Sequence, residues 1–316
     1  MRRGSVVSMS LGSRSLYPFV LAAMCERPRE ERARVRVLDF PAGDGALSFA
    51  LAAAGFDVVG ADLFPETFGS GRTAAGLESK AGAAALFERM ARCRLPGWLV
   101  ERAFGGEVPA RTDVPCVAAD LEAGEGSWPA PGLEGLFDVV VCVEGIEHVV
   151  DRHRTLRNLR RLLRPGGRLL LTTPNLLSLR ARLASCFAGQ RAFKSFIDEH
   201  TSVWGRSDDG RRIYHGHAFL INYFQLRYSL HHCGLRIERL WPSNWSPSSL
   251  MLAPMVPLVW LAHRASERSA RRAFVRGQAR GTIDAGARPP FDEIRRHVLS
   301  PEMLFNATMI VEASAR

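Results

Sequence analysis

Short apolar runs alternate with helical stretches along most of the chain. The run at residues 35–40 is bounded by Pro41 and Gly43, a pattern that predicts a buried strand ending in a turn. Residues 46–54 are rich in Ala and Leu and precede Gly55, so they predict a helix with a glycine stop. Further strands are predicted at residues 56–61, 116–119, 137–143, 168–173, 235–240 and 308–313, and a further helix at 152–163. This alternation predicts an α/β fold with a mostly parallel sheet and helices on both faces.

Two long segments interrupt the alternation. Residues 64–112 join the second and third strands and are longer than a strand–helix–strand unit needs, with a helix predicted at residues 77–95. Residues 241–300 follow the sixth strand. The predicted organisation is a helical lead-in at 1–34, a core at 35–240, an insertion at 241–300 and a closing strand within 301–316.

The second insertion contains an apolar run, residues 250–262, followed by an Arg-rich stretch at 264–280. The apolar run is too short to span a bilayer, and Pro254 and Pro257 interrupt it. Two interpretations stay open. The segment is either a cap packed against the core or an interfacial helix with an apolar face and cationic flanks.

The net charge of +10 changes this picture little. A basic chain can bind nucleic acid, an anionic membrane or acidic substrates. However, Lys80 and Lys194 are the only lysines among 42 basic residues, and Ala and Gly are abundant, so a coding bias toward Arg explains most of the charge. The sequence contains no added RNA-binding module and no aromatic stacking pattern, which argues against nucleic acid.

The cysteines and the N-terminus both indicate a reducing, cytoplasmic setting. Six Cys residues are scattered without a Cys-x-x-Cys pair, so neither a zinc site nor a disulfide framework is predicted. The apolar run at residues 16–24 contains Pro18 and lacks a small-residue cleavage site. We therefore expect a helix that leads into the first strand, not a signal peptide.

A glycine-containing turn follows the first strand. Asp39 ends that strand, and Gly43 and Gly45 let the backbone turn sharply and approach a ligand before the helix begins. Asp62 and Asp120 end the next two strands, where carboxylates can accept hydrogen bonds from ribose hydroxyls or an adenine amino group. Acids at three successive strand ends predict a nucleotide site at the carboxyl edge of the sheet.

Four segments resemble the motifs of class I S-adenosylmethionine-dependent methyltransferases, in particular the ubiquinone-pathway group. Residues 37–50 resemble the first motif, and residues 58–62 resemble the acidic end of the second strand. Residues 137–149 resemble the fourth-strand motif, and residues 159–175 the helix–turn–strand signature with its Arg-Pro-Gly-Gly turn. The resemblance implies a doubly wound, Rossmann-like sheet of seven strands and an enzyme that uses S-adenosylmethionine.

The resemblance also implies cofactor-binding roles. Pro41 departs from the family, which usually has glycine there, and its missing N–H removes one backbone donor. Binding of NAD is disfavoured because the third glycine of the dinucleotide fingerprint would fall at Ser48. The methionine part of the cofactor would contact Asp39, Pro41, Gly43 and Gly45, the ribose would contact Asp62, and the adenine would contact Asp120 and Leu121. Glu144 would lie at a strand end that faces the cofactor.

The acceptor side is predicted around a Glu-x-x-Glu-His segment. In ubiquinone-pathway O-methyltransferases and small-RNA 2′-O-methyltransferases, a similar segment holds a divalent ion, and the RNA enzymes add a later His. Glu144, Glu147, His148 and His217 could therefore bind Mg²⁺ or Mn²⁺. Alternatively, Glu147 and His148 are catalytic without a metal, with His148 as a general base. His215 also precedes the next helix and can face a ligand.

Three functions stay open at this stage. The first is methyl transfer to a small-molecule, lipid-linked or glycan acceptor, at oxygen, in the cytoplasm or at the inner face of a membrane. The second is a metal-dependent RNA 2′-O-methyltransferase. The third is a non-enzymatic scaffold, which the intact acids and glycines of the cofactor side disfavour.

Overall fold

The computed structural model describes residues 16–69, 97–106, 113–124, 132–190, 197–200, 202–207 and 212–316. They divide into two compact units. The first contains the described residues up to 174, together with 197–244 and 308–316, and the second contains 175–190 and 245–307. The sequence had placed 175–190 in the core. The helix predicted at 77–95 lies outside the described residues.

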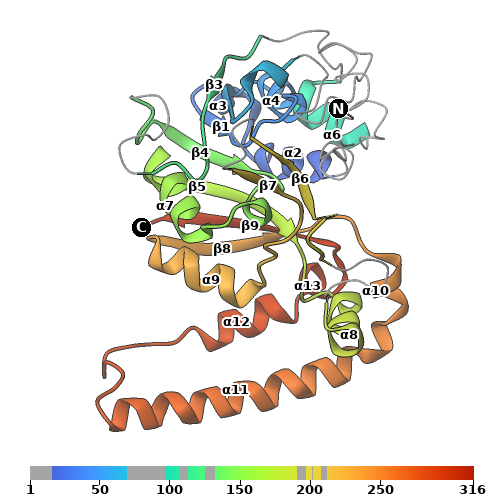
Figure 1. Ribbon diagram of the computed structural model, residues 1–316, viewed down its shortest axis with the longest axis vertical. Coiled ribbons are helices and arrows are strands. Elements are labelled where there is room, and N and C mark those ends of the chain that lie inside the picture. Colours follow the sequence, from blue (N-terminus) through green and yellow to red (C-terminus); the bar gives the residue numbers. More distant parts are fainter. Residues whose placement is uncertain are drawn as a thin grey trace. The chain divides into compact units, whose positions relative to one another are not determined.

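A seven-stranded sheet forms the centre of the first unit, in the order β3-β2-β1-β4-β5-β9-β8 (Figure 1). Strands β1 to β5 run parallel, and β9 pairs antiparallel with both β5 and β8. The predicted doubly wound, Rossmann-like fold is confirmed. The strands are β1 (Arg36–Asp39), β2 (Asp57–Asp62), β3 (Cys116–Ala118), β4 (Phe137–Cys142), β5 (Leu163–Pro174), β8 (Leu235–Trp241) and β9 (Thr308–Ala315).

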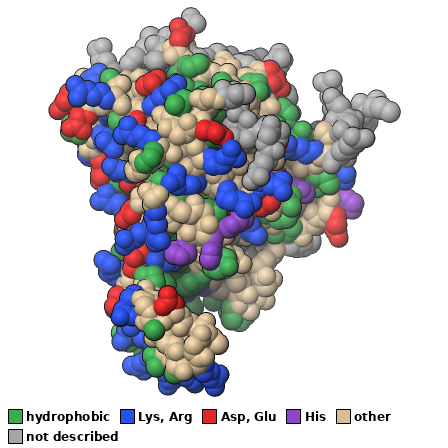
Figure 2. All heavy atoms as spheres, turned by 90° about the vertical axis from the view of Figure 1, so that its left-hand side faces the viewer, with side chains coloured by type: hydrophobic (Ala, Val, Ile, Leu, Met, Phe, Trp, Pro, Cys, Tyr) green, Lys and Arg blue, Asp and Glu red, His purple; other side chains and the backbone are tan. Residues whose placement is uncertain are grey.

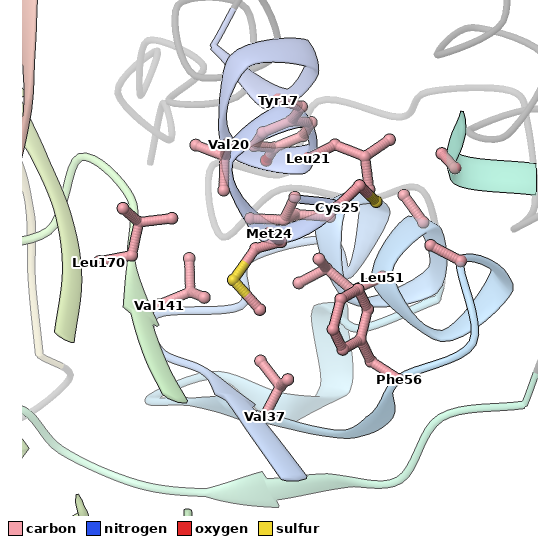
Figure 3. Packing of buried hydrophobic residues seen from close by; sticks show 14 of the residues in the cluster. Tyr17, Val20, Leu21, Met24, Cys25, Val37, Leu51, Phe56, Val141 and Leu170 are labelled. Carbon is pink, nitrogen blue, oxygen red and sulfur yellow. The ribbon is translucent and has the colours of Figure 1, made fainter. Parts of the chain in front are cut away.

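Helices cover both faces of this sheet because neighbouring strand residues point to opposite sides. Val37 and Val141 belong to the hydrophobic cluster that also contains α2 (Tyr17–Met24), α4 (Ala46–Ala53) and α6 (Gly97–Phe104). Figure 3 shows the side chains of α2 above Val37, Val141 and Leu170. Leu38 and Val140, the neighbours of Val37 and Val141 on these strands, are also buried and point to the other face of the sheet. The helices packed on β4, β5 and β8 are α7 (Arg152–Leu162) and α9 (Tyr223–His232).

The guanidinium of Arg32 is buried where three helices end. Arg32 closes α3 (Arg29–Arg32) and is only 1% exposed. Its charge faces the C-terminal carbonyls of α2, α4 and α6, which carry the negative ends of the helix dipoles. No hydrogen bond to a carboxylate is present for it within the described residues. The carbonyl oxygens that accept from it belong to Cys25, Arg27, Ala54, Arg102 and Ala103, at 3.0–3.3 Å.

The second unit is helical. Its long helix, α11 (Val256–Ala279), is held to α12 (Phe291–Val298) by buried Glu267, whose carboxylate contacts Arg264, Arg271 and Arg295. None of the helices described here is both long and apolar enough to cross a membrane. The shorter elements are α8 (Leu179–Ala188), α10 (Pro247–Met251), the 3₁₀ turn η3 (Ala253–Met255) and α13 (Pro301–Phe305).

Candidate active site

The order of the strands locates a ligand site between β1 and β4. The chain winds outward from β1 in one direction through β2 and β3, and in the other through β4 and β5. Open α/β sheets bind ligands at the carboxyl ends of the strands at such a reversal. The glycine turn after β1 and the Glu-x-x-Glu-His segment after β4 both lie at this edge.

Asp62 at the end of β2 holds the glycine turn in place. Its Oδ2 accepts the N–H of Gly43 at 2.8 Å, and its Oδ1 accepts the N–H of Phe64 at 2.9 Å. Gly43 and Gly45 adopt φ angles of +56° and +83°, which residues with a Cβ disfavour. A carboxylate has about four acceptor positions. Asp62 can therefore brace the turn and still accept from ribose hydroxyls.

Asp39 lies beneath the turn. Its Oδ2 accepts the hydroxyl of Ser48, on the first turns of α4, at 2.6 Å, and the residue is 1% exposed. Burial raises the pKa of the Asp39 carboxyl to about 7, although the hydrogen bond from Ser48 acts to lower this pKa. The position favours support of the turn, so the predicted contact with the methionine part of the cofactor stays a prediction.

The raised pKa of Asp39 makes stability depend on pH. Because the folded-state pKa lies above the unfolded value, the contribution of Asp39 is complete below about pH 4 and is lost as pH rises through about 7. Asp39→Asn should therefore gain stability relative to wild type between about pH 5 and 8, on the order of 2 kcal/mol. Urea unfolding at both pH values measures this. Asp57→Asn, at the exposed start of β2, is the control, and an equal gain in both variants would contradict the role of Asp39.

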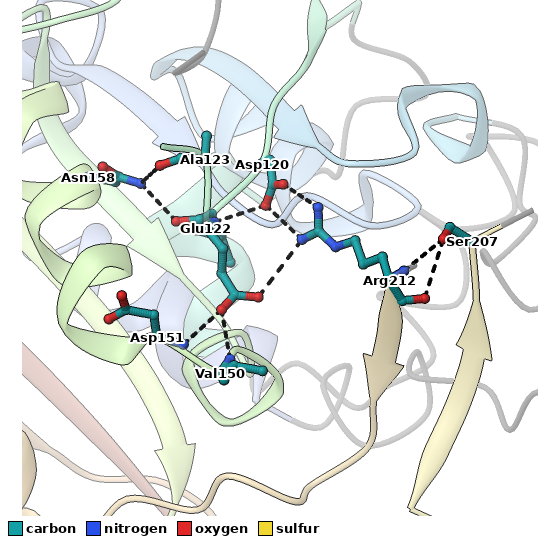
Figure 4. Close-up of polar contacts among 9 residues, drawn as sticks. Asp120, Glu122, Ala123, Val150, Asp151, Asn158, Ser207 and Arg212 are labelled. Atoms are coloured by element: carbon teal, nitrogen blue, oxygen red, sulfur yellow. Dashed lines mark hydrogen bonds and ion pairs between the residues drawn. The ribbon is translucent and has the colours of Figure 1, made fainter. Parts of the chain in front are cut away.

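Asp120, the acid predicted beside the adenine, is paired with an arginine. Arg212 forms two hydrogen bonds to its carboxylate, one of them at 2.8 Å to Oδ1 (Figure 4). Burial alone would raise the pKa of Asp120, but the bonds from Arg212 and from the N–H of Glu122 hold it below its ordinary value. Asn158 fixes the same loop by donating to the carbonyl of Leu121 at 3.0 Å. Asp120 is thus ionised, and the hydrogen bonds from Arg212 occupy part of the acceptor capacity of its two carboxylate oxygens.

Arg212 belongs to a hairpin, β6 (Val203–Arg206) and β7 (Ile213–His215), that the sequence analysis missed. The ring of Tyr214 on β7 packs edge-on against Phe64, which follows β2, with 5.3 Å between centroids. The hairpin therefore packs on the ends of β2 and β3. Its sequence signal was present, because two short runs flank Asp-Asp-Gly at 208–210, a turn-forming sequence.

Glu147, His148 and His217 come together after β4. Their candidate ligand atoms all lie within 4.8 Å of one another, and the two imidazole rings are 4.9 Å apart between centroids. Glu147 is fully buried, and its Oε2 accepts from the hydroxyl of Thr173 at 3.3 Å. Glu144, the fourth predicted ligand, lies outside this group. Its φ of +50° is unusual for a residue with a side chain and is a type of strain that clusters at functional sites.

The ring of His148 has a defined orientation. Its Nδ1 lies 3.1 Å from the carbonyl oxygens of His215 and Gly216, so this nitrogen carries the proton and donates. Nε2 then keeps its lone pair. Burial, together with the neighbouring His217, lowers the pKa of His148 to about 3. The imidazole is consequently neutral at physiological pH.

Pro41 packs against the loop that leads to this cluster. A Cβ on Gly145 would lie 2.7 Å from Cδ of Pro41, so only glycine fits beside the proline ring. Pro41 thus couples the turn after β1 to the loop after β4. Its predicted weak contact with the cofactor stays a prediction.

The strand order, the glycine turn and the acids at the strand ends define a class I, Rossmann-like methyltransferase domain. The chain belongs to the methyltransferase family whose model, described as "Methyltransferase domain", matches residues 15–240. This agrees with the resemblance drawn from the four motifs, and neither the RNA enzyme nor the scaffold is favoured.

Curated relatives and solved structures were also found. The ubiquinone biosynthesis O-methyltransferase of Xanthomonas oryzae is 31% identical over 147 residues, which are 46% of each chain. That of Pseudomonas aeruginosa is 41% identical over 59 residues, covering 19% of this chain and 25% of the relative. The chain thus spans about half the length, or less, of the curated relatives it matches.

Two solved structures resemble the chain more loosely. One is the 1,6-didemethyltoxoflavin-N1-methyltransferase of Burkholderia thailandensis, with bound S-adenosylhomocysteine, at 13% identity and a TM-score of 0.39 over 97% of this chain and 79% of the other. The other is an S-adenosylmethionine-dependent methyltransferase from Mesorhizobium loti, at 14% identity and a TM-score of 0.40 over 95% and 97%.

Proposed function

We propose that this chain transfers a methyl group from S-adenosylmethionine to an oxygen atom of a small-molecule acceptor. The observation that carries the proposal is the shared edge of the sheet, where Asp62 braces the glycine turn and Glu147, His148 and His217 converge. The bound cofactor supplies a methyl group activated by its sulfonium. Asp62 would hold the ribose, while Asp120 and Leu121 would flank the adenine. The named activity of the Xanthomonas relative supports an oxygen acceptor.

The same proposal includes a divalent metal held by Glu147, His148 and His217. The Nδ1–H of His148 is fixed by two carbonyls, an arrangement that orients Nε2 as a ligand. One carboxylate and two imidazoles suit Mn²⁺ better than Mg²⁺, which prefers oxygen ligands. A metal there would lower the pKa of an acceptor hydroxyl. Without it, Nε2 of His148 is the remaining acceptor for that proton, but a pKa of about 3 makes it a weak base.

The proposal also includes a lipid-linked or glycan acceptor and a cytoplasmic location. It further includes peripheral contact with the inner face of a membrane. Residues 250–280 are the segment that would make this contact, since they combine an apolar run with arginines. A lipid-linked acceptor would be reached at the surface of the bilayer.

Two calorimetric titrations test the enzyme and its metal separately. S-adenosylmethionine should bind the wild type, and Mn²⁺ should bind a single site. His217→Ala should weaken Mn²⁺ affinity at least about 10-fold and leave cofactor affinity within about threefold, because His217 lies on the acceptor side. His232→Ala, exposed on α9, is the matched control and should change neither.

The outcomes separate the two parts of the proposal. Absence of cofactor binding would refute the methyltransferase itself. Cofactor binding combined with equal Mn²⁺ affinity in wild type and His217→Ala would refute the metal alone.

A further inference from the structure

One face of α11 is apolar along its first half and cationic along its second. The residues on it are spaced three or four positions apart, which places them on one side of a helix. All of them are exposed, and Glu267, which binds α12, lies on the opposite side. Figure 1 shows α12 running along α11. The face consists of Leu258, Leu261, Ala265, Arg268, Arg272 and Arg276.

The apolar half continues into the elements before α11. Leu258 and Leu261 are 62% and 58% exposed, Met251 at the end of α10 is 83% exposed, and Leu250 is 39% exposed. Trp260, 48% exposed, is not part of this face, because it lies on the side of α11 that carries Arg264, whose guanidinium stands over its ring. Large apolar side chains gathered in one exposed patch mark a surface that binds a partner or a membrane.

The cationic half differs from the arginines on the inner side of the helix. Arg264 and Arg271 are paired with Glu267 and so serve the packing of the unit. By contrast, none of the acidic side chains that the structure describes lies within ion-pair distance of Arg268, Arg272 or Arg276. Figure 2 shows Lys and Arg side chains gathered around the end of this unit. A coding bias explains the number of arginines, but not the alignment of Arg268, Arg272 and Arg276 on one face.

We propose that α10 and this face of α11 dock onto a bilayer containing anionic phospholipids, a step that rests on the proposed membrane contact and names its chemistry. The apolar half enters the layer of headgroups and upper acyl chains, and the arginines meet lipid phosphates. The separation of apolar and cationic residues along the length of α11 fits a bilayer, whose apolar and anionic layers lie next to each other.

Co-sedimentation of the full chain with vesicles tests the proposal. Vesicles of phosphatidylcholine are compared with vesicles in which about one third of the lipid is phosphatidylglycerol. The wild type should bind the anionic vesicles at least about 10-fold more tightly, and salt should weaken this binding by screening the arginines. Leu258→Glu with Leu261→Glu should lower binding about 10-fold or more, and Arg268→Glu with Arg272→Glu should abolish the preference for anionic lipid.

The controls introduce glutamate at exposed apolar and basic positions on helices of the first unit. Tyr228→Glu on α9 and Arg157→Glu on α7 replace exposed side chains and should leave vesicle binding unchanged. Equal loss in these controls, or wild-type binding that ignores lipid charge, would overturn the proposal. So would self-association without lipid that Leu258→Glu abolishes, because the face would then join two copies. Each variant is also titrated with S-adenosylmethionine. Unchanged cofactor affinity would show that a loss of vesicle binding is separate from the proposed methyl transfer.

Discussion

Replacement of Arg32 by leucine is expected to lower the free energy of unfolding by about 3–5 kcal/mol. The guanidinium donates to five carbonyl oxygens, four of them at the ends of three helices, and leucine would leave these acceptors buried without that donor. The loss also removes the positive charge that faces three helix dipoles. Urea unfolding followed by circular dichroism measures the change.

Two further variants show which property of Arg32 matters. Arg32→Lys keeps the charge but replaces the planar fork by one ammonium, so it should lose part of the stability. Arg34→Leu, two positions away and exposed, should stay within about 0.5 kcal/mol of wild type. A loss of less than about 1 kcal/mol in Arg32→Leu would show that water satisfies the carbonyls.

Replacement of Asp62 by asparagine is expected to weaken binding of S-adenosylmethionine about 100-fold. The carboxylate receives the N–H groups of Gly43 and Phe64, whereas an amide offers one oxygen and would turn its NH₂ toward one of these donors. The turn would lose its brace and the ribose its acceptor. Each charge-assisted bond contributes about 1.5–3 kcal/mol, and about 1.4 kcal/mol corresponds to a factor of ten.

Calorimetry with the cofactor measures the effect of Asp62→Asn. Thermal unfolding should show that the variant still folds, since the sheet does not depend on the turn. Asp57→Asn at the other end of β2 should bind like wild type. Affinity within about threefold of wild type in Asp62→Asn would mean that the turn is held by other contacts.

The sheet could be predicted from the sequence because its strands are buried. Runs such as residues 137–143 have apolar side chains on both faces, and a helix follows at 152–162 with the expected spacing. The glycine turn could be predicted for a different reason: Gly43 and Gly45 adopt positive φ angles, which glycine tolerates best.

The polar contacts of the site could not be predicted in the same way. Arg212 and Asp120 are 92 positions apart, and only the hairpin brings them together. Glu144 has a positive φ angle and lies outside the group formed by Glu147, His148 and His217, and no spacing rule reveals either fact. The burial of Arg32 depends on three helix ends that meet in space, so its sequence context resembles that of any surface arginine.

The place of β9 in the sheet has a consequence for how the protein is made. It is the last of the seven strands in chain order, yet it lies between β5 and β8. While the ribosome synthesises residues 245–307, β5 and β8 each expose an edge that has no strand to pair with. Such edges recruit foreign strands. Until β9 pairs with them, these edges leave the nascent chain open to aggregation, and a chaperone that covers them would protect it.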